Sequence, residues 1–324
     1  MDRFLIAAFV VVGVPVATAG YVVLAERLLG LLPERRRASI RPWLWLAPGL
    51  AFLLVYLVYP SIVTLYLSFL NASSSQPVGT ANYEFVFTNP GMLVALRNNI
   101  IWVLVFTTVS VLFGLLIAVL VDRVPYESLA KGVIFLPMAI SMVGAGVIWR
   151  FMYDFRPLGS PQTGTVNAML MTLAPGFEPQ AWLVNTPWNN LALIVAAAWI
   201  WTGFCMVILS AGLKGIPTEL LEAARVDGAT ELQVFGHIIV PMLGSTIAVV
   251  GTTMIIFALK AFDIVYVMTN GNFDTEVIAN RMYKEMFNFR DFGRASAIAV
   301  VLLAAIVPVM LLNIRRFRQQ EEIR

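Results

Sequence analysis

Residues 45–69 read WLAPGLAFLLVYLVYPSIVTLYLSF and carry no charged side chain. The hydrocarbon core of a bilayer is about 30 Å thick and a helix needs about 20 apolar residues to cross it, so this stretch predicts a transmembrane helix. The same criterion predicts seven spans, at about residues 4–25, 43–70, 99–121, 132–153, 190–212, 240–268 and 295–314. We therefore expect an all-α fold, that of a polytopic helical membrane protein.

The composition supports a membrane protein and argues against several catalytic classes. Of the 324 residues 59% are hydrophobic and 13% are charged, and the mean hydropathy is +0.82, unlike an ordinary soluble domain. The one cysteine, Cys205, excludes an internal disulfide, and the one histidine, His237, cannot build a histidine-based metal cluster. No P-loop motif occurs, so we expect no ATP hydrolysis, no catalytic residue, no metal and no cofactor in this chain. The net charge of +3 is interpreted as a signal for membrane orientation, not for nucleic-acid binding.

The arginines predict which loops stay inside the cell, because short basic loops remain cytoplasmic. They gather between the first two spans (Arg27, Arg35, Arg36, Arg37, Arg41) and in the C-terminal tail (Arg315, Arg316, Arg318, Arg324). If the loop between the first two spans and the C-terminal tail are both inside the cell, the connections at about 122–131 and 213–239 are also cytoplasmic, and the N-terminus lies outside. The connections at about 71–98, 154–189 and 269–294 then face outward, although the last of these is itself basic.

The first span has a second interpretation, because Arg3, an apolar run and Ala17-Thr18-Ala19 are also typical of a cleaved signal peptide. Cleavage would leave the arginine-rich loop outside, against the charge rule, so a retained helix is favoured. We expect an extra N-terminal transmembrane helix with a basic cytoplasmic loop over 1–42, a six-helix core over 43–318 and a cytoplasmic tail over 319–324.

A charged segment interrupts the apolar chain at residues 222–241, EAARVDGATELQVFGHIIVP. A helix is predicted from Pro217, with Thr218 as a possible cap, and Asp227-Gly228 ends it because glycine accepts a left-handed conformation. Thr230-x-x-Gln233 is a capping box that predicts a second helix. The pair could be an amphipathic connector on lipid headgroups. Two acids on the first helix favour a docking element for another protein instead.

The same segment resembles a known motif. Glu222-Ala223-Ala224, Gly228 and Ile238-x-Val240-Pro241 match the pattern E-A-A-x3-G-x9-I-x-L-P of ABC-importer permeases, with valine in place of the leucine. Residues 45–69, 135–153, 262–271 and 291–312 are similar to successive landmarks of the maltose-type carbohydrate permeases. Residues 272–287, NFDTEVIANRMYKEMF, are similar to the α-glucoside members. The resemblance covers about residues 40–318.

This resemblance implies a type I ABC-importer permease core of six helices, preceded here by one more. The loop at about 215–241 would be the coupling helix, its residues being Glu222, Ala223, Ala224, Arg225, Asp227 and Gly228. The glutamate would meet basic groups of an ATPase, and Gly228 would permit the bend. The implied partners are a second homologous permease, two ATPase subunits that bind ATP and Mg, an extracytoplasmic sugar-binding protein and membrane lipid. The implied location is a bacterial or archaeal inner membrane.

Candidate substrate contacts lie in the spans at about 190–212 and 240–268. If the span at 240–268 is continuous, Lys260 and Asp263 lie inside it at a spacing that allows an ion pair. If the helix instead ends near Phe262, both lie at the outer interface. Rings for stacking on a sugar would come from Trp199, Trp201, Phe204 and Phe257, for which core packing or an interfacial belt is the alternative.

Two questions stay open at this point. In the maltose-type relatives asparagines hold the sugar, whereas we match Ala197, Ala258 and Ala261 to those positions, so the resemblance does not say which permease holds it. The favoured solute is an α-glucoside or related oligosaccharide, with a glucosylated osmolyte or glycerol derivative as the alternative. An ion-gradient-driven secondary transporter is the second hypothesis. It would need internal repeats, discontinuous helices and intramembrane carboxylates, and the sequence shows no repeat.

Overall fold

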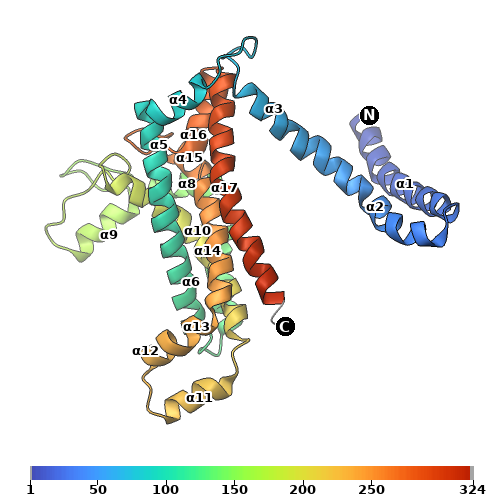
Figure 1. Cartoon of the computed structure of the whole chain (residues 1–324). Coiled ribbons are helices and arrows are strands. Elements are labelled where there is room, and N and C mark those ends of the chain that lie inside the picture. Colours follow the sequence, from blue (N-terminus) through green and yellow to red (C-terminus); the bar gives the residue numbers. More distant parts are fainter. Residues whose placement is uncertain (1, 322–324) are drawn as a thin grey trace. The chain divides into compact units, whose positions relative to one another are not determined.

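The computed structural model describes residues 2–321, and side chains from Val11 to Arg315 (Figure 1). Residues 322–324 of the predicted tail, and the side chains of Arg3, Arg316 and Arg318, lie outside that part. Helices dominate it, and it contains no strand beyond one isolated bridge between Leu70 and Pro77. The chain divides into two compact units, one ending at Thr64 and the other beginning at Leu65.

The first unit is a helical hairpin of α1 (Asp2–Gly30) and α2 (Glu34–Leu53). Glu26 holds the two helices together: its carboxylate accepts hydrogen bonds from Arg41 Nε and Trp45 Nε1, both at 3.0 Å. Helix α2 continues through a π-helical turn (Leu54–Val58) into α3 (Tyr59–Leu67). The predicted division between residues 42 and 43 therefore lies inside a helix, and most of the predicted basic loop is the start of α2.

In the second unit, α4 (Ala81–Thr88) comes before the first span. That span consists of α5 (Pro90–Ile101), a π-helical turn (Trp102–Phe106) and α6 (Thr107–Val121). Helices α7 (Glu127–Phe135), η3 (Leu136–Ala139) and α8 (Met142–Met152) follow, then α9 (Thr165–Leu173) and α10 (Trp188–Leu213). The charged segment holds α11 (Thr218–Val226), α12 (Glu231–Val234), a π-helical turn (Phe235–Ile239) and α13 (Val240–Met242). The rest is α14 (Gly244–Leu259), α15 (Asp263–Met268), α16 (Ile278–Tyr283), a π-helical turn (Lys284–Asn288) and α17 (Phe292–Glu321).

Five helical stretches of the described residues are long and apolar enough to cross a membrane, or up to seven if two bent pairs each count as one span. The predicted span 132–153 is one such pair, bent by 97° between η3 and α8. Pro137 supplies no N–H there, and Ser141 caps α8 by accepting a hydrogen bond from the Gly144 N–H at 3.0 Å. The second pair bends by 72° between α13 and α14.

The predicted span 240–268 is wrong as one continuous helix. Helix α14 ends at Leu259, Lys260 to Phe262 are not helical, and α15 starts afresh at Asp263. Lys260 and Asp263 therefore do not share a helix, and the described ion pairs do not include one between them. The alternative, that the helix ends near Phe262, describes the structure more closely.

Helix α10 forms the centre of the second unit, with α6, α8, α14 and α15 against it. Its closest approach to α6 depends on Gly114: a Cβ there would lie 2.5 Å from Cys205 Cβ and 3.0 Å from the Met206 nitrogen. Cys205 is fully buried at this contact, as its apolar context predicts. Glycine is thus required where the two helices cross.

The connections at about 122–131 and 213–239 lie at one end of this unit, and those at about 71–98 and 269–294 lie toward the other end (Figure 1). At one end, Arg123 pairs with Glu231, and Lys214 Nζ lies 2.7 Å from the Glu127 carboxylate. At the other end, the Phe292 N–H donates to the Ala72 carbonyl at 3.1 Å. Loops predicted to share a side of the membrane therefore do lie together.

We predict that Gly114→Ala destabilises the protein by about 1–3 kcal/mol, the usual cost of overpacking a close contact. Thermal unfolding of the purified complex in detergent would measure this as a lower midpoint. Gly251→Ala is the matched control, because that glycine is also inside a helix and a Cβ there meets no atom within 4 Å. Equal midpoints for the two variants would contradict the contact.

Candidate functional site

The first candidate site is the helix–bend–helix segment, residues 217–239. Helix α11 ends in a Schellman motif: the Gly228 N–H donates to the Arg225 carbonyl at 3.1 Å, and the Ala229 N–H donates to the Ala224 carbonyl at 2.9 Å. Gly228 has φ +86° and open space around its Cα, so only its backbone conformation requires glycine. The predicted bend is therefore present, with the predicted residue at its centre.

The start of each helix tests the predicted caps. The capping box of α12 is present, since Thr230 and Gln233 bond reciprocally to each other's backbone N–H groups. The prediction of Thr218 as a cap is wrong: Pro217 occupies the N-cap of α11 and Thr218 is the first helical residue. Proline fits there because the first N–H groups of a helix have no partner within the helix.

One side of α11 faces the core and the other faces outward. Leu221 and Ala224 pack on the main hydrophobic cluster, whereas Glu222, Ala223 and Asp227 are exposed. Two apolar side chains near the bend are also exposed, Val226 by 86% and Leu232 by 82%. The outer face thus combines acidic and apolar groups, which is typical of a surface that a partner covers.

Ion pairs brace the bend and leave Glu222 out. Arg225 Nε donates to the Glu231 carboxylate at 2.8 Å, and Arg123 from the neighbouring connection donates to the same carboxylate. The bond with Glu231 raises the pKa of Arg225, and the bonds with Arg225 and Arg123 lower that of Glu231. The ion pairs of the described residues do not include Glu222. Its carboxylate is available to another protein.

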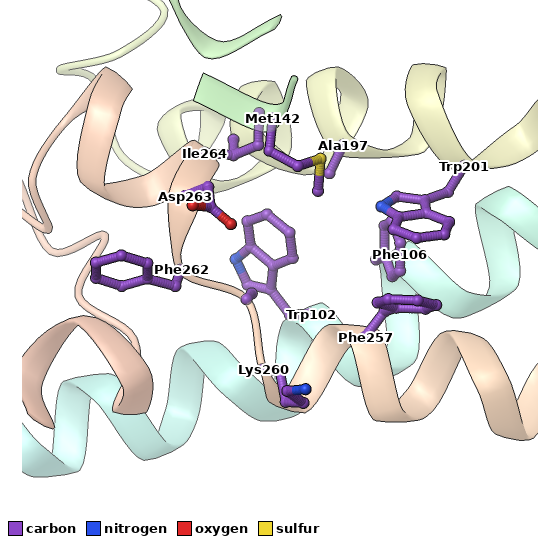
Figure 2. Close-up of a pocket in the computed structure, with 11 residues that line it drawn as sticks. Trp102, Phe106, Met142, Ala197, Trp201, Phe257, Lys260, Phe262, Asp263 and Ile264 are labelled. Carbon is purple, nitrogen blue, oxygen red and sulfur yellow. The ribbon is translucent and has the colours of Figure 1, made fainter. Parts of the chain in front are cut away.

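The second candidate site is a cavity of about 220 Å³ in the core (Figure 2). Four predicted substrate residues line it, namely Trp201, Phe257, Lys260 and Asp263. Lys260 lies in the break after α14, and Asp263 is the first residue of α15. The remaining lining residues are Trp102, Phe106, Met142, Ala197, Ala261, Phe262 and Ile264.

Aromatic rings form the cavity wall. The ring centroids of Trp201 and Phe257 are 3.8 Å apart, and those of Trp102 and Phe106 are 6.0 Å apart. Trp102 is 2% exposed, and its indole Nε1–H has no hydrogen-bond partner among the described residues. A buried donor without a partner costs about 1–3 kcal/mol, so a bound acceptor in the cavity would be stabilised.

Two predicted residues lie elsewhere. Phe204 contacts Trp201 edge-on at 5.8 Å but does not line the cavity. Trp199 packs against Trp149 at 5.8 Å and lines a separate apolar groove beside α6. Sequence reasoning missed Trp102 and Phe106, although they lie one turn apart in a predicted span. That spacing of two aromatic residues was the available signal.

The family described as "Binding-protein-dependent transport system inner membrane component" matches residues 110–316. The chain is 57% identical over 281 residues to the osmoprotective compounds uptake permease protein GgtC of Synechocystis, covering 87% of this chain and 100% of that protein. It is 50% identical over 278 residues to the alpha-glucoside transport system permease protein AglF of Rhizobium meliloti. This match covers 86% of this chain and 82% of that protein.

A solved structure has a similar fold. The crystal structure of a bacterial ABC transporter involved in the import of the acidic polysaccharide alginate matches with a TM-score of 0.69 and 25% identity. The match covers 87% of this chain and 99% of that one. The all-α membrane fold predicted from the sequence is therefore confirmed.

We predict that Glu231→Gln loosens the helix–bend–helix segment, because both arginines lose their charged partner. Exposed ion pairs contribute about 0.2–1 kcal/mol each, so amide hydrogen exchange over residues 218–234 should become a few-fold faster. Glu219→Gln is the control, since Glu219 is exposed on the same segment and the described ion pairs do not include it. Exchange that is unchanged by Glu231→Gln would contradict the bracing role.

Proposed function

Because the chain belongs to the family of binding-protein-dependent transport system inner membrane components, we propose a role for each of its two candidate sites. The chain is a permease subunit of an ATP-driven importer and has no catalytic activity of its own, as the sequence predicts. The helix–bend–helix segment is its docking surface for a separate ATPase. The cavity is part of the path of the transported sugar.

The exposed Glu222 carries the docking proposal. It is an acid that the chain does not neutralise, on a helix whose other side is anchored to the core. An ATPase with basic groups in a groove would supply the missing partner, and Val226 and Leu232 would be covered by the same contact. Two hydrogen-bonded arginines and the Schellman motif hold the segment stiff, so a movement of the ATPase would move it as one body.

The lining of the cavity supports a sugar as the solute. Carbohydrates present C–H faces that pack on aromatic rings and hydroxyls that need donors and acceptors. The cavity offers five such rings, the indole N–H of Trp102, which has no partner among the described residues, one cation and one anion. One charge of each sign favours a neutral polyhydroxy solute. Relatives named for alpha-glucosides and for osmoprotective compounds favour an α-glucoside or a glucosylated osmolyte.

The remaining partners follow from the type of transporter. A second homologous permease would complete the translocation pathway, and two ATPase subunits would bind ATP and Mg. An extracytoplasmic sugar-binding protein would meet the end of the core opposite the helix–bend–helix segment. The protein lies in a bacterial or archaeal inner membrane, with the docking segment and the C-terminus on the cytoplasmic side. The arginine distribution supports this orientation.

The secondary-transporter hypothesis predicted one feature that the structure has, a discontinuous helix beside Asp263. Family membership nevertheless decides for the importer. A broken helix in lipid is a general way to expose polar groups to a solute, whatever supplies the energy.

We predict that Glu222→Lys separates the permease from its ATPase. Reversing an interfacial charge removes about 2 kcal/mol or more of binding, so co-purification of the ATPase and sugar uptake should both fall about tenfold or more. Pull-down from solubilised membranes with quantification of the bound ATPase checks this. Glu84→Lys, the same change in an exposed acid at the opposite end of the core, should leave the ATPase bound. Normal ATPase recovery with Glu222→Lys would refute the docking assignment.

We predict that Trp201→Ala raises the half-saturating sugar concentration about tenfold, which corresponds to about 1.4 kcal/mol. The reason is that the ring lines the cavity and packs on Phe257. Uptake of radiolabelled maltose, trehalose, sucrose and glucosylglycerol by the assembled transporter measures it. Trp199→Ala is the control, being two residues away on α10 but outside the cavity. The same increase in both variants would show a general packing effect and would exclude the cavity.

A further inference from the structure

The break between α14 and α15 has no cause in its own sequence. Residues 260–262 are Lys-Ala-Phe, with no glycine and no proline, and alanine and lysine favour helices. A helix in lipid also resists breaking, because each carbonyl freed from its i+4 N–H donor needs another partner. The break must therefore be stabilised by a contact from elsewhere in the fold.

That contact is the side chain of Asn99 from α5, which is 2% exposed. Its Nδ2 donates to the Leu259 carbonyl at 3.1 Å and more weakly to the Ala258 carbonyl at 3.4 Å. In a continuous helix these carbonyls would accept from the N–H groups of Asp263 and Phe262. The Ala258 carbonyl still accepts from the Ala261 N–H at 3.2 Å, so the Asn99 amide chiefly replaces the donor that the Leu259 carbonyl lost.

The same amide also contacts the start of α16. Asn99 Oδ1 accepts from the Ile278 N–H at 2.8 Å, which is the first helical N–H of α16. One side chain thus satisfies the end of α14 and the start of α16. Both the amide nitrogen and the amide oxygen of Asn99 are used. A smaller or apolar residue in its place would therefore leave backbone groups unpaired.

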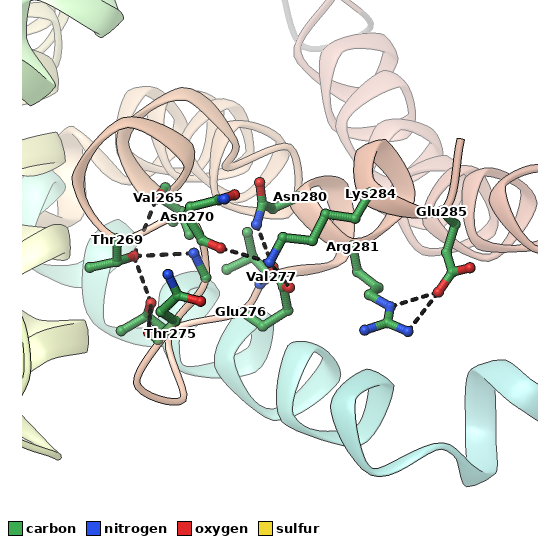
Figure 3. Close-up of polar contacts among 12 residues, drawn as sticks. Val265, Thr269, Asn270, Thr275, Glu276, Val277, Asn280, Arg281, Lys284 and Glu285 are labelled. Carbon is green, nitrogen blue, oxygen red and sulfur yellow. Dashed lines mark hydrogen bonds and ion pairs between the residues drawn. The ribbon is translucent and has the colours of Figure 1, made fainter. Parts of the chain in front are cut away.

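The chain between these two helix ends is fixed by neighbouring polar groups. Asn98 Nδ2 donates to the carbonyls of Asp274 at 2.6 Å and Glu276 at 2.8 Å. The Glu276 side chain accepts from Asn280 Nδ2 at 2.6 Å and pairs with Lys284 Nζ at 2.7 Å (Figure 3). Asn270, Phe273 and Asp274 have positive φ in this stretch, a strained backbone that such contacts must hold.

We propose that Asn99 is a positioning residue for the cavity. By holding α14 open after Leu259, it places Lys260 and Asp263 where they line the solute path, although it does not line the cavity itself. This inference rests on the proposal that the cavity holds the transported sugar. Without the Asn99 amide, residues 260–262 would tend to rejoin the helix, and Lys260 and Asp263 would take new positions relative to the cavity.

The test is an electron-spin distance measurement in the assembled transporter. Spin labels go on Ser245 and Asn272, which are exposed before and after the break, in a Cys205→Ala background. Asn99→Leu, similar in size but without hydrogen bonds, should shift the label distance by several ångströms and raise the half-saturating concentration for glucosylglycerol or trehalose about tenfold. Asn99→Ala gives the same comparison if the leucine variant does not assemble.

Two further variants separate positioning from general damage. Asn167→Leu removes an equally buried asparagine that bonds Asp154, Gln180 and Trp182, and it should leave both the label distance and the half-saturating concentration unchanged. Adding Ala261→Gly to Asn99→Leu disfavours the rejoined helix and should recover about fivefold of the lost affinity. This rescue is not expected if Asn99 only supports folding.

The outcomes distinguish the two proposals. A label distance that Asn99→Leu leaves unchanged overturns the positioning role. A shifted label distance together with a raised half-saturating sugar concentration, partly reversed by Ala261→Gly, supports both the positioning role of Asn99 and the sugar path through the cavity. A shifted distance with unchanged half-saturation would show that Asn99 holds the break but that the sugar does not use this cavity.

Discussion

Backbone hydrogen bonding in lipid is the constraint on which this structure depends. Inside a bilayer water cannot pair with a free N–H or carbonyl group, so each interruption of a helix must be satisfied by the protein. Two of the interruptions in the core are satisfied by a side chain. Ser141 caps α8 after the 97° bend, and Asn99 caps the end of α14. Ser141 and Asn99 each lie in a span that also provides residues to the lining of the cavity.

Polar side chains in the core are therefore concentrated at one end. Asn98, Asn99, Asn189 and Asn190 are all buried, and each bonds the backbone or side chains near residues 258–278. The opposite end is built with exposed ion pairs around Glu127 and Glu231. The buried end also holds ion pairs, Lys284–Glu276 at 2.7 Å and Arg281–Glu285 at 2.6 Å. Charged groups keep their hydration at a surface, whereas buried polar and charged groups need hydrogen-bonding partners in fixed positions.

The sequence predicted most of the architecture, and the bend and the capping box of the helix–bend–helix segment. Apolar length identifies spans, and Asp227-Gly228 and Thr230-x-x-Gln233 act through contacts within a few residues, so local patterns suffice for them. The broken span was predicted poorly because Lys260 to Phe262 are compatible with helix, and the residue that opens them is 160 positions away. Trp102 was missed for the same reason. Its role depends on which side of the bundle its ring faces, which no local pattern indicates.

The two candidate sites belong to one continuous piece of chain. Residues 217–268 run from the bend at Gly228 through α14 to Lys260 and Asp263 in the cavity wall. Helix α14 has 16 residues and so spans about 24 Å. Its two ends are both breaks, at Leu243 and at Lys260, and it is one uninterrupted α-helix between them. On the proposed function, a displacement of the docking segment by the ATPase would reach the cavity through this rod. Asn99 decides where that rod ends, and therefore which side chains the movement carries past the sugar.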